Sequence, residues 1–259
     1  MATLLKIAVL NATTQAAPSE VQDWARACEL QMNRDYFRSA VKTAVVDVVY
    51  IPKGGVIPLD AWWIAVVDNA DMADALGYHD ITSAGLPLGK VFVQTAKLYG
   101  EEPSTVLSHE LLEMLGDAFI NVLVTDGNDN SKYWAREVCD AVQAVTYDIV
   151  LPATTTKPAR TIKVSDFVLQ NYWNSVPTKR PYSFKDSLTG PVPALAPGGY
   201  MPFVKNGIWD TINRRTGNTS PAKFALETKK LRLDNPLNPR QAQRIIKPAD
   251  RLKATAKKV

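Results

Sequence analysis

The chain has 259 residues, of which 46% are hydrophobic and 22% are charged. This composition excludes a fibrous or wholly disordered protein, because enough apolar surface is present to offset the entropy of the chain. The longest uninterrupted apolar run, residues 61–67, is far shorter than the roughly 18 residues of a membrane-spanning helix, so we expect no membrane segment. Lys6 interrupts the apolar start, and we expect a first strand there rather than a signal peptide.

The net charge of +4 is distributed unevenly along the chain. Residues 229–259 contain ten Lys or Arg and two Asp, a charge of +8, whereas the preceding 228 residues carry 20 positive and 24 negative charges. A basic, proline-punctuated segment with few aromatic residues is typical of an extended tail. The sequence therefore predicts a core subdomain over 1–120, an irregular C-terminal subdomain over 121–228 and a basic tail over 229–259.

The first hundred residues alternate between strand and helix patterns. Strands are predicted at residues 6–10, 43–51 and 62–68, where β-branched and other apolar residues cluster. A helix is predicted after Pro18, with Ser19 as its N-cap. Its buried face repeats with helical spacing through Val21, Trp24, Ala25, Cys28 and Met32.

A further strand and a second long helix follow. We expect a short helix at residues 71–76, a loop, a fourth strand at 90–95 and a helix from Ser104 to Gly116. This order of elements indicates an α+β fold.

Beyond residue 120 the local patterns are weaker. Residues 125–131 are typical of a polar turn, and residues 133–142 favour a helix. Short strands are predicted at 146–151 and 161–167, and proline- and glycine-rich spacers fill 174–200. The C-terminal subdomain should therefore be irregular, with some β-structure.

The predicted helix ending at Gly116 carries the strongest chemical signal. At about 100° per residue, Glu113, Asp117 and Glu110 lie about 40°, 80° and 100° from His109, so the four polar groups share one arc. Zinc hydrolases place two ligands at i and i+4 on one helical face, with a carboxylate beside them. We therefore predict His109 and Glu113 as metal ligands and Glu110 as the general base; the alternative is a solvated helix surface.

Glutamate at the second ligand position changes the expected metal chemistry. A carboxylate ligand donates more charge to the ion than an imidazole, so the ion acidifies its bound water less. Zinc remains the favoured divalent ion, with calcium and manganese as alternatives, because carboxylate ligands suit harder ions. A structural ion or a decayed site is nearly as well supported by this pattern as a catalytic one.

The order of elements resembles a minimal zincin domain, and several stretches are similar to a group of zincin-like proteins from bacteriophages and bacteria. The similar stretches are residues 75–80, 89–93, 109–117, 136–140, 164–168 and 198–200. The resemblance implies a zincin-like mixed sheet with an active-site-type helix. It also implies that residues 90–95 form an edge strand along which an extended peptide can bind.

The resemblance also suggests where further ligands lie. Gluzincin-like sites draw a carboxylate from a later segment, which makes Glu137 and Asp140 the leading candidates for the third ligand. Asp117 is an alternative ligand or a group that orients His109. His79 is the only other imidazole, and it is either an alternative ligand, a substrate-facing group or a structural residue.

Two functions follow as expectations. The first is a bacteriophage virion or assembly protein built on a metallopeptidase scaffold, with a structural or weakly catalytic metal site. The alternative is an active metal-dependent endopeptidase. In the first case residues 229–259 bind other virion proteins or copies of the chain, with nucleic acid less favoured, and the protein resides in the virion or, during assembly, in the host cytoplasm.

Overall fold

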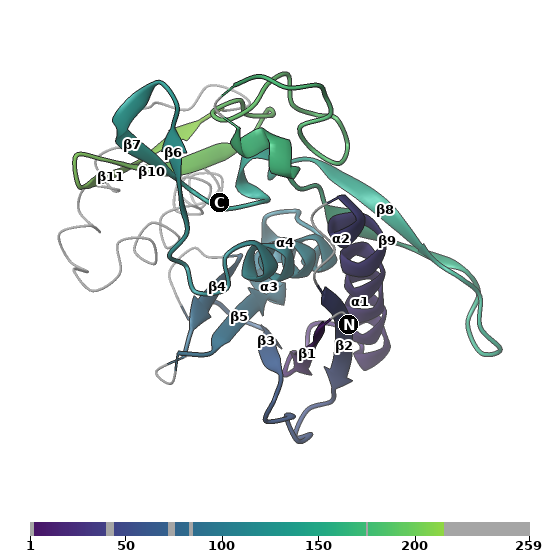
Figure 1. The fold of residues 1–259 in the computed structure, drawn as a ribbon. Coiled ribbons are helices and arrows are strands. Elements are labelled where there is room, and N and C mark those ends of the chain that lie inside the picture. Colours follow the sequence, from purple (N-terminus) through teal and green to yellow (C-terminus); the bar gives the residue numbers. More distant parts are fainter. Residues whose placement is uncertain (1–2, 40–43, 72–75, 83–84, 175, 215–259) are drawn as a thin grey trace, which may run out of the picture.

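The computed structural model describes residues 3–39, 44–71, 76–82, 85–174 and 176–214. These residues form an α+β fold with a mixed sheet and few helices (Figure 1). The predicted tail, residues 229–259, and most of the helix predicted at 71–76 lie outside the described residues. Within the described part, no helix is long and apolar enough to span a membrane.

The N-terminal part is built on a five-stranded sheet in the order β2-β1-β3-β5-β4. Strands β2, β1, β3 and β5 run parallel to one another, and β4 is antiparallel to β5. The strands are β1 (Thr3–Asn11), β2 (Ala44–Ile51), β3 (Trp62–Val67), β4 (Gly77–Ile81) and β5 (Pro87–Phe92). The structure confirms the strands predicted near 6–10, 43–51 and 62–68, where local hydrophobic patterning was strong.

The predicted edge strand is wrong in position and in extent. The strand ends at Phe92, and residues Val93–Leu98 form helix α3 instead of continuing it. Because β5 pairs with β3 on one side and β4 on the other, it is an internal strand. Among the described residues β4 is the outermost strand on this side, although no strand was predicted there.

Helix α1 (Pro18–Leu30) packs against the sheet and continues into a π-helical turn, η1 (Gln31–Tyr36), and a short helix, α2 (Phe37–Ser39). Its N-cap is Ala17 and not the predicted Ser19. The helix begins earlier because proline suits its first turn, and because the Glu20 carboxylate accepts the Ala17 backbone N–H at 2.7 Å.

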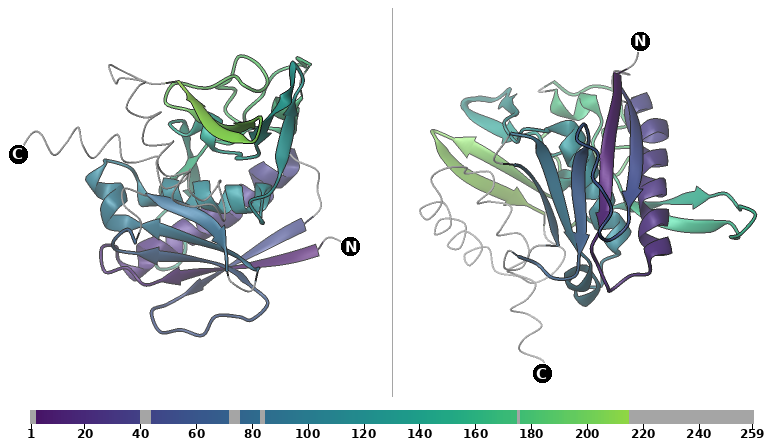
Figure 2. Two further views of the ribbon diagram at one scale, coloured as in Figure 1. Left: turned by 90° about the vertical axis from the view of Figure 1, so that its left-hand side faces the viewer. Right: turned by 90° about the horizontal axis from the view of Figure 1, so that it is seen from below.

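Helix α4 (Pro103–Gly116) is buried on nearly every side. It lies between the five-stranded sheet and the C-terminal strands (Figure 2), which explains why both its apolar and its polar face are covered. Its N-cap is Glu102. Ser104, predicted as the cap, instead donates a hydrogen bond from its hydroxyl to the backbone carbonyl of Lys163 at 2.8 Å.

The helix predicted over residues 133–142 is wrong. Strands β6 (Leu123–Asp126) and β7 (Asp129–Ala135) form a hairpin whose turn lies in the predicted polar segment. Only Asp140–Val142 is helical, as the 3-10 turn η2. Pairing of β7 with a distant strand outweighs the local helical propensity of this segment.

The remaining elements complete two further sheets. Strands β10 (Tyr200–Lys205) and β11 (Ile208–Asn213) were not predicted and join β6 and β7 in the order β11-β10-β7-β6. The predicted strands near 146–151 and 161–167 are confirmed as the hairpin β8 (Thr146–Leu151) and β9 (Arg160–Ser165). A 3-10 turn, η3 (Gln170–Trp173), lies in the irregular segment between β9 and β10.

One hydrophobic cluster joins the two parts of the chain on either side of residue 120. It packs Ile64 and Leu107 of the N-terminal part together with Trp134, Phe167 and Met201 of the C-terminal part. The position of helix α4 is therefore determined from both sides, and the side chains on its polar arc are held between two layers.

Candidate metal centre

Helix α4 supplies three polar side chains to the interior of the protein. His109, Glu110 and Glu113 are all buried, and Glu113 is only 1% exposed. The alternative of a solvated helix surface is therefore excluded for these residues. Burying ionisable groups is costly unless they are paired or bind a cation, so their partners define what the cluster can do.

The first group of ligand atoms forms around His109. Its Nε2 lies 3.1 Å from Glu113 Oε1 and 3.4 Å from Asp140 Oδ1. One ligand atom from each of the three residues lies within 4.8 Å of the others, which is close enough for a single metal ion. Asp140 is the first residue of η2, and its Oδ1 accepts a hydrogen bond from the Tyr200 hydroxyl. The predicted ligands His109, Glu113 and Asp140 are thus brought together.

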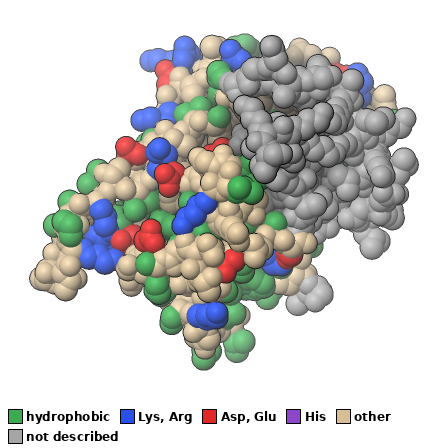
Figure 3. Space-filling view, turned by 180° about the vertical axis from the view of Figure 1, so that it is seen from behind, with side chains coloured by type: hydrophobic (Ala, Val, Ile, Leu, Met, Phe, Trp, Pro, Cys, Tyr) green, Lys and Arg blue, Asp and Glu red, His purple; other side chains and the backbone are tan. Residues whose placement is uncertain are grey.

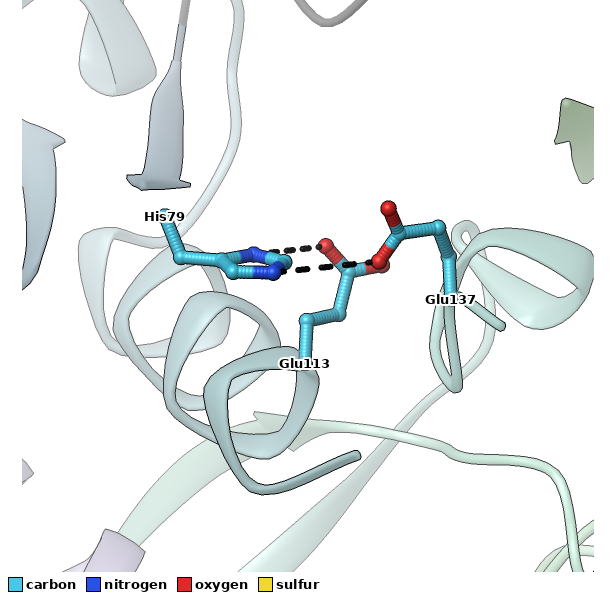
Figure 4. A group of neighbouring side chains, drawn as sticks. All are labelled: His79, Glu113 and Glu137. Atoms are coloured by element: carbon cyan, nitrogen blue, oxygen red, sulfur yellow. Dashed lines mark ion pairs between the residues drawn. The ribbon is translucent and has the colours of Figure 1, made fainter. Parts of the chain in front are cut away.

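A second group forms around His79 on strand β4, and it shares Glu113 with the first. His79 Nδ1 lies 3.4 Å from Glu113 Oε2, and its Nε2 lies 3.9 Å from Glu137 Oε2 (Figure 4). The ligand atoms of these three residues also lie within 4.8 Å of one another. His79 and Glu137, both named from the sequence, are therefore part of the same cluster.

Glu110 lies at the edge of this cluster and faces a pocket. Its Oε2 is 3.6 Å from His79 Nδ1. With His109 and Glu113 it lines a pocket to which strand β4 and the segments after α3 and η2 also contribute. The other lining residues include Gly77, Tyr78, Tyr99, Gln143, Ala144 and Tyr200. Glu110 is therefore accessible from the pocket, as the general base predicted at this position requires.

Asp117 is in neither group of ligand atoms. Its two carboxylate oxygens accept the backbone N–H groups of Asn121 and Val122, at 3.1 and 3.0 Å. It therefore stabilises the turn that follows α4. Helix α4 ends at Gly116, so the angle expected for an uninterrupted helix does not apply to Asp117.

Tyr200 is a member of the cluster that the sequence reasoning did not single out. It lies in one of the stretches that carry the family resemblance, and the preceding pair of glycines is a local signal, because a Cβ at Gly199 would clash with the Ala141 carbonyl oxygen. Glycine is required where two backbones approach this closely. The close approach brings the start of β10 against η2 and so places the Tyr200 hydroxyl on Asp140.

The electrostatics of the cluster favour positive charge. Burial by itself lowers the pKa of His109, but the charge of Glu113 and hydrogen bonds to Asp140 and Glu113 outweigh it and raise the pKa well above its usual value. Burial and the charges of Asp140 and Glu113 raise the pKa of Tyr200, which keeps its hydroxyl protonated. The His109 shift reflects the negative charge of its carboxylate neighbours, which attracts a proton or a metal cation alike.

The donor set fits a divalent metal ion. Imidazole nitrogens and carboxylate oxygens are the ligands of zinc, and a carboxylate-rich set also suits harder ions. The buried His, Glu and Asp groups could therefore bind a metal ion. Comparisons of the chain with models of known protein families, with curated proteins and with solved structures give no match.

Proposed function

We propose that this protein is a zincin-like, metal-dependent peptidase. The observation that carries the proposal is a buried group of one imidazole and two carboxylates, His109, Glu113 and Asp140, beside Glu110 at an open pocket. Structural metal sites are closed by protein ligands on all sides, whereas catalytic sites keep one position open to water and substrate. Access from the pocket therefore favours catalysis over a purely structural ion.

Each residue has a defined part in the proposed reaction. His109, Glu113 and Asp140 would hold the metal ion, which would supply polarisation of the scissile carbonyl and acidification of a water molecule. Glu110 accepts the proton of the attacking water and returns it to the leaving amine. The Tyr200 hydroxyl positions Asp140 by donating a hydrogen bond to it.

The substrate is proposed to be an extended peptide beside β4. This strand lines the pocket with Gly77 and Tyr78, so it takes the place that the sequence assigned to residues 90–95. Main-chain hydrogen bonds to a sheet strand hold a peptide in an extended conformation. The metal is proposed to be zinc, with manganese and calcium as the alternatives that its two carboxylates also favour.

Metal content and peptide cleavage by the full chain test this proposal. We expect the purified protein to hold a divalent metal and to cleave casein or a peptide library, and we expect Glu110→Gln to keep the metal while its cleavage falls at least about 100-fold. Glu102→Gln, an exposed change at the N-cap of the same helix, should cleave like wild type. Bound metal without any cleavage by wild type would overturn the peptidase and leave only a structural ion.

The sequence supports a second proposal, a bacteriophage virion or assembly protein whose metal site is structural or weakly catalytic. Its support is the charge split, which joins a tail of +8 to a body of −4. The proposed partners are other virion proteins or copies of the chain, with nucleic acid as the rival partner. Deleting residues 229–259 should abolish assembly while the body stays folded; normal assembly without the tail would exclude this role for it.

A further inference from the structure

We propose that the cluster binds two divalent metal ions, with Glu113 as the carboxylate that bridges them. The first ion is the one already proposed for His109, Glu113 and Asp140, so this inference rests on the proposed function. The second ion is bound by His79, Glu113 and Glu137. Nothing in the sequence pattern of α4 alone implies this second site.

The two oxygens of Glu113 face different imidazoles. Oε1 lies 3.1 Å from His109 Nε2, and Oε2 lies 3.4 Å from His79 Nδ1. A single carboxylate directed at two sets of ligands is the arrangement that bridges two ions in dinuclear hydrolases. Each set is completed by its own carboxylate, Asp140 for the first and Glu137 for the second.

The charge of the cluster also matches two ions. Four carboxylates, those of Glu110, Glu113, Glu137 and Asp140, are buried around two imidazoles. With neutral imidazoles these side chains carry a charge of about −4, which two divalent cations balance.

The second site is deeper than the first. His79 is 0% and Glu137 is 2% exposed, and neither contributes to the lining of the pocket, whereas His109 does. The second ion is therefore not positioned to meet substrate. Its effect acts through Glu113, because a carboxylate shared between two cations donates less negative charge to each of them. The first ion then acidifies its water more than an unshared glutamate ligand would allow.

The orientation of His79 is consistent with a metal ligand. One ring nitrogen faces Glu113 and the other faces Glu137 (Figure 4), and one ligand atom from each of the three residues lies within 4.8 Å of the others. Metal-binding histidines are commonly oriented in this way. The rival arrangement is a protonated His79 that links Glu113 and Glu137 without a metal ion.

The number of ions per chain tests the inference. The full chain is stripped with a chelator and dialysed against Zn²⁺ or Mn²⁺, and bound metal is measured by mass spectrometry. We expect two ions per chain for wild type and for the surface control Glu102→Gln, and one ion for His79→Gln and for Glu137→Gln. In the Mn²⁺-loaded wild type, electron paramagnetic resonance should show two magnetically coupled ions.

The outcomes separate this inference from the proposed function. One ion per chain in both wild type and His79→Gln, with peptide cleavage intact, would overturn the second site and leave the protonated His79 as the explanation. No bound metal and no cleavage in wild type would overturn both proposals. If His79→Gln fails to fold, the number of ions per wild-type chain and the electron paramagnetic resonance spectrum of the Mn²⁺-loaded wild type still test the second site.

Discussion

Glu113 belongs to both groups of ligand atoms in the candidate centre, so it contributes to more of the centre than any other side chain. Helix α4 holds it 1% exposed, four residues after His109, and its two oxygens take part in both groups of ligand atoms. Asp140 and Glu137 each take part in only one. A change at Glu113 should therefore affect the whole cluster, whereas a change at either of the other two should affect one half of it.

Replacing Glu113 by Gln tests whether this side chain takes part in the whole cluster. The amide keeps the size of the side chain but loses the charge and one acceptor oxygen, so the affinity for Zn²⁺ should fall by more than about tenfold at every site. The measurement is equilibrium dialysis of the full chain, with Glu102→Gln as the matched control. Unchanged binding by Glu113→Gln would remove it from the ligand set.

At the scale of elements, the close approach of α4 to β4 and β5 positions the centre. Both strands carry a glycine where the helix crosses them. A Cβ at Gly77 would lie 2.8 Å from Val106 Cγ1 and 3.1 Å from Glu110 Cγ, and a Cβ at Gly89 would lie 3.3 Å from Met114 Sδ. Because neither glycine has a side chain, the helix packs directly on the strands and brings Glu110 within 3.6 Å of His79.

Gly77→Ala should therefore separate β4 from α4. We expect a loss of about 1–3 kcal/mol in the free energy of unfolding, as for other overpacked sites, together with reduced peptide cleavage because Glu110 is displaced. Gly190→Ala is the matched control, because its new Cβ would lie 3.9 Å from the nearest atom outside its chain neighbours. Urea unfolding and a cleavage assay give the two readouts. If Gly77→Ala had the stability and the cleavage rate of wild type, the packing of α4 on β4 would not require glycine at this position.

The carboxyl ends of β1 and β3 are joined by Asp68. Its carboxylate accepts hydrogen bonds from the hydroxyls of Thr13 and Thr14 and from the backbone N–H groups of Thr14 and Gln15. The Thr13 and Thr14 hydroxyls contribute most to lowering the pKa of Asp68, to about 2. The folded state thus favours the ionised carboxylate, whose unfolded pKa is about 3.9.

The depressed pKa predicts an acid-dependent loss of stability. The contribution of Asp68 is fully present above its unfolded pKa and is lost as the pH falls from about 4 towards about 2. Asp68→Asn should be less stable than wild type at pH 7, and the difference should shrink across this interval. Denaturant unfolding at a series of pH values measures it. A constant difference at all pH values would show that the ionised carboxylate makes no net contribution.

At the scale of the whole molecule, the candidate centre is shared between parts that are distant in sequence. His79 comes from the five-stranded sheet, Glu113 from α4, and Glu137 and Asp140 from the segment between β7 and β8. A separate contact joins the β8–β9 hairpin, which projects from the body (Figure 1), to α1 through hydrogen bonds from Arg160 to Asp23. On the face seen in Figure 3, acidic and basic side chains of the described residues are interspersed.

Metal removal should consequently destabilise the entire fold. An ion that binds only the folded chain adds about 4 kcal/mol to the free energy of unfolding when its free concentration is a thousand times its dissociation constant. We expect the chelated protein to melt at a lower temperature than the protein with excess Zn²⁺, and re-addition of the ion to restore the transition. An identical melting temperature in both states would contradict metal binding by the folded form.

The α4 motif shows how far local pattern predicts the site. Helical periodicity alone places His109, Glu110 and Glu113 on one arc, and the structure has all three buried on that arc. The same reasoning fails for Asp117, because the helix ends one residue earlier. Glu137 and Asp140 were named through a family resemblance, and local propensity assigned their segment to a helix that does not form.

The elements whose patterns are local follow from the sequence alone: β1, α1, β2, β3, α4 and the β8–β9 hairpin. The order of the strands and the position of β4 depend instead on tertiary contacts. Residues 77–81 are too short and polar to signal a strand, and His79 is positioned by pairing opposite Gly89 in β5. The contacts of His79 with Glu113 and Glu137 join residues farther apart in the chain, and such contacts leave no periodicity in either segment. Local pattern therefore predicts the α4 half of the candidate metal centre, and the packing of distant segments brings the other half to it.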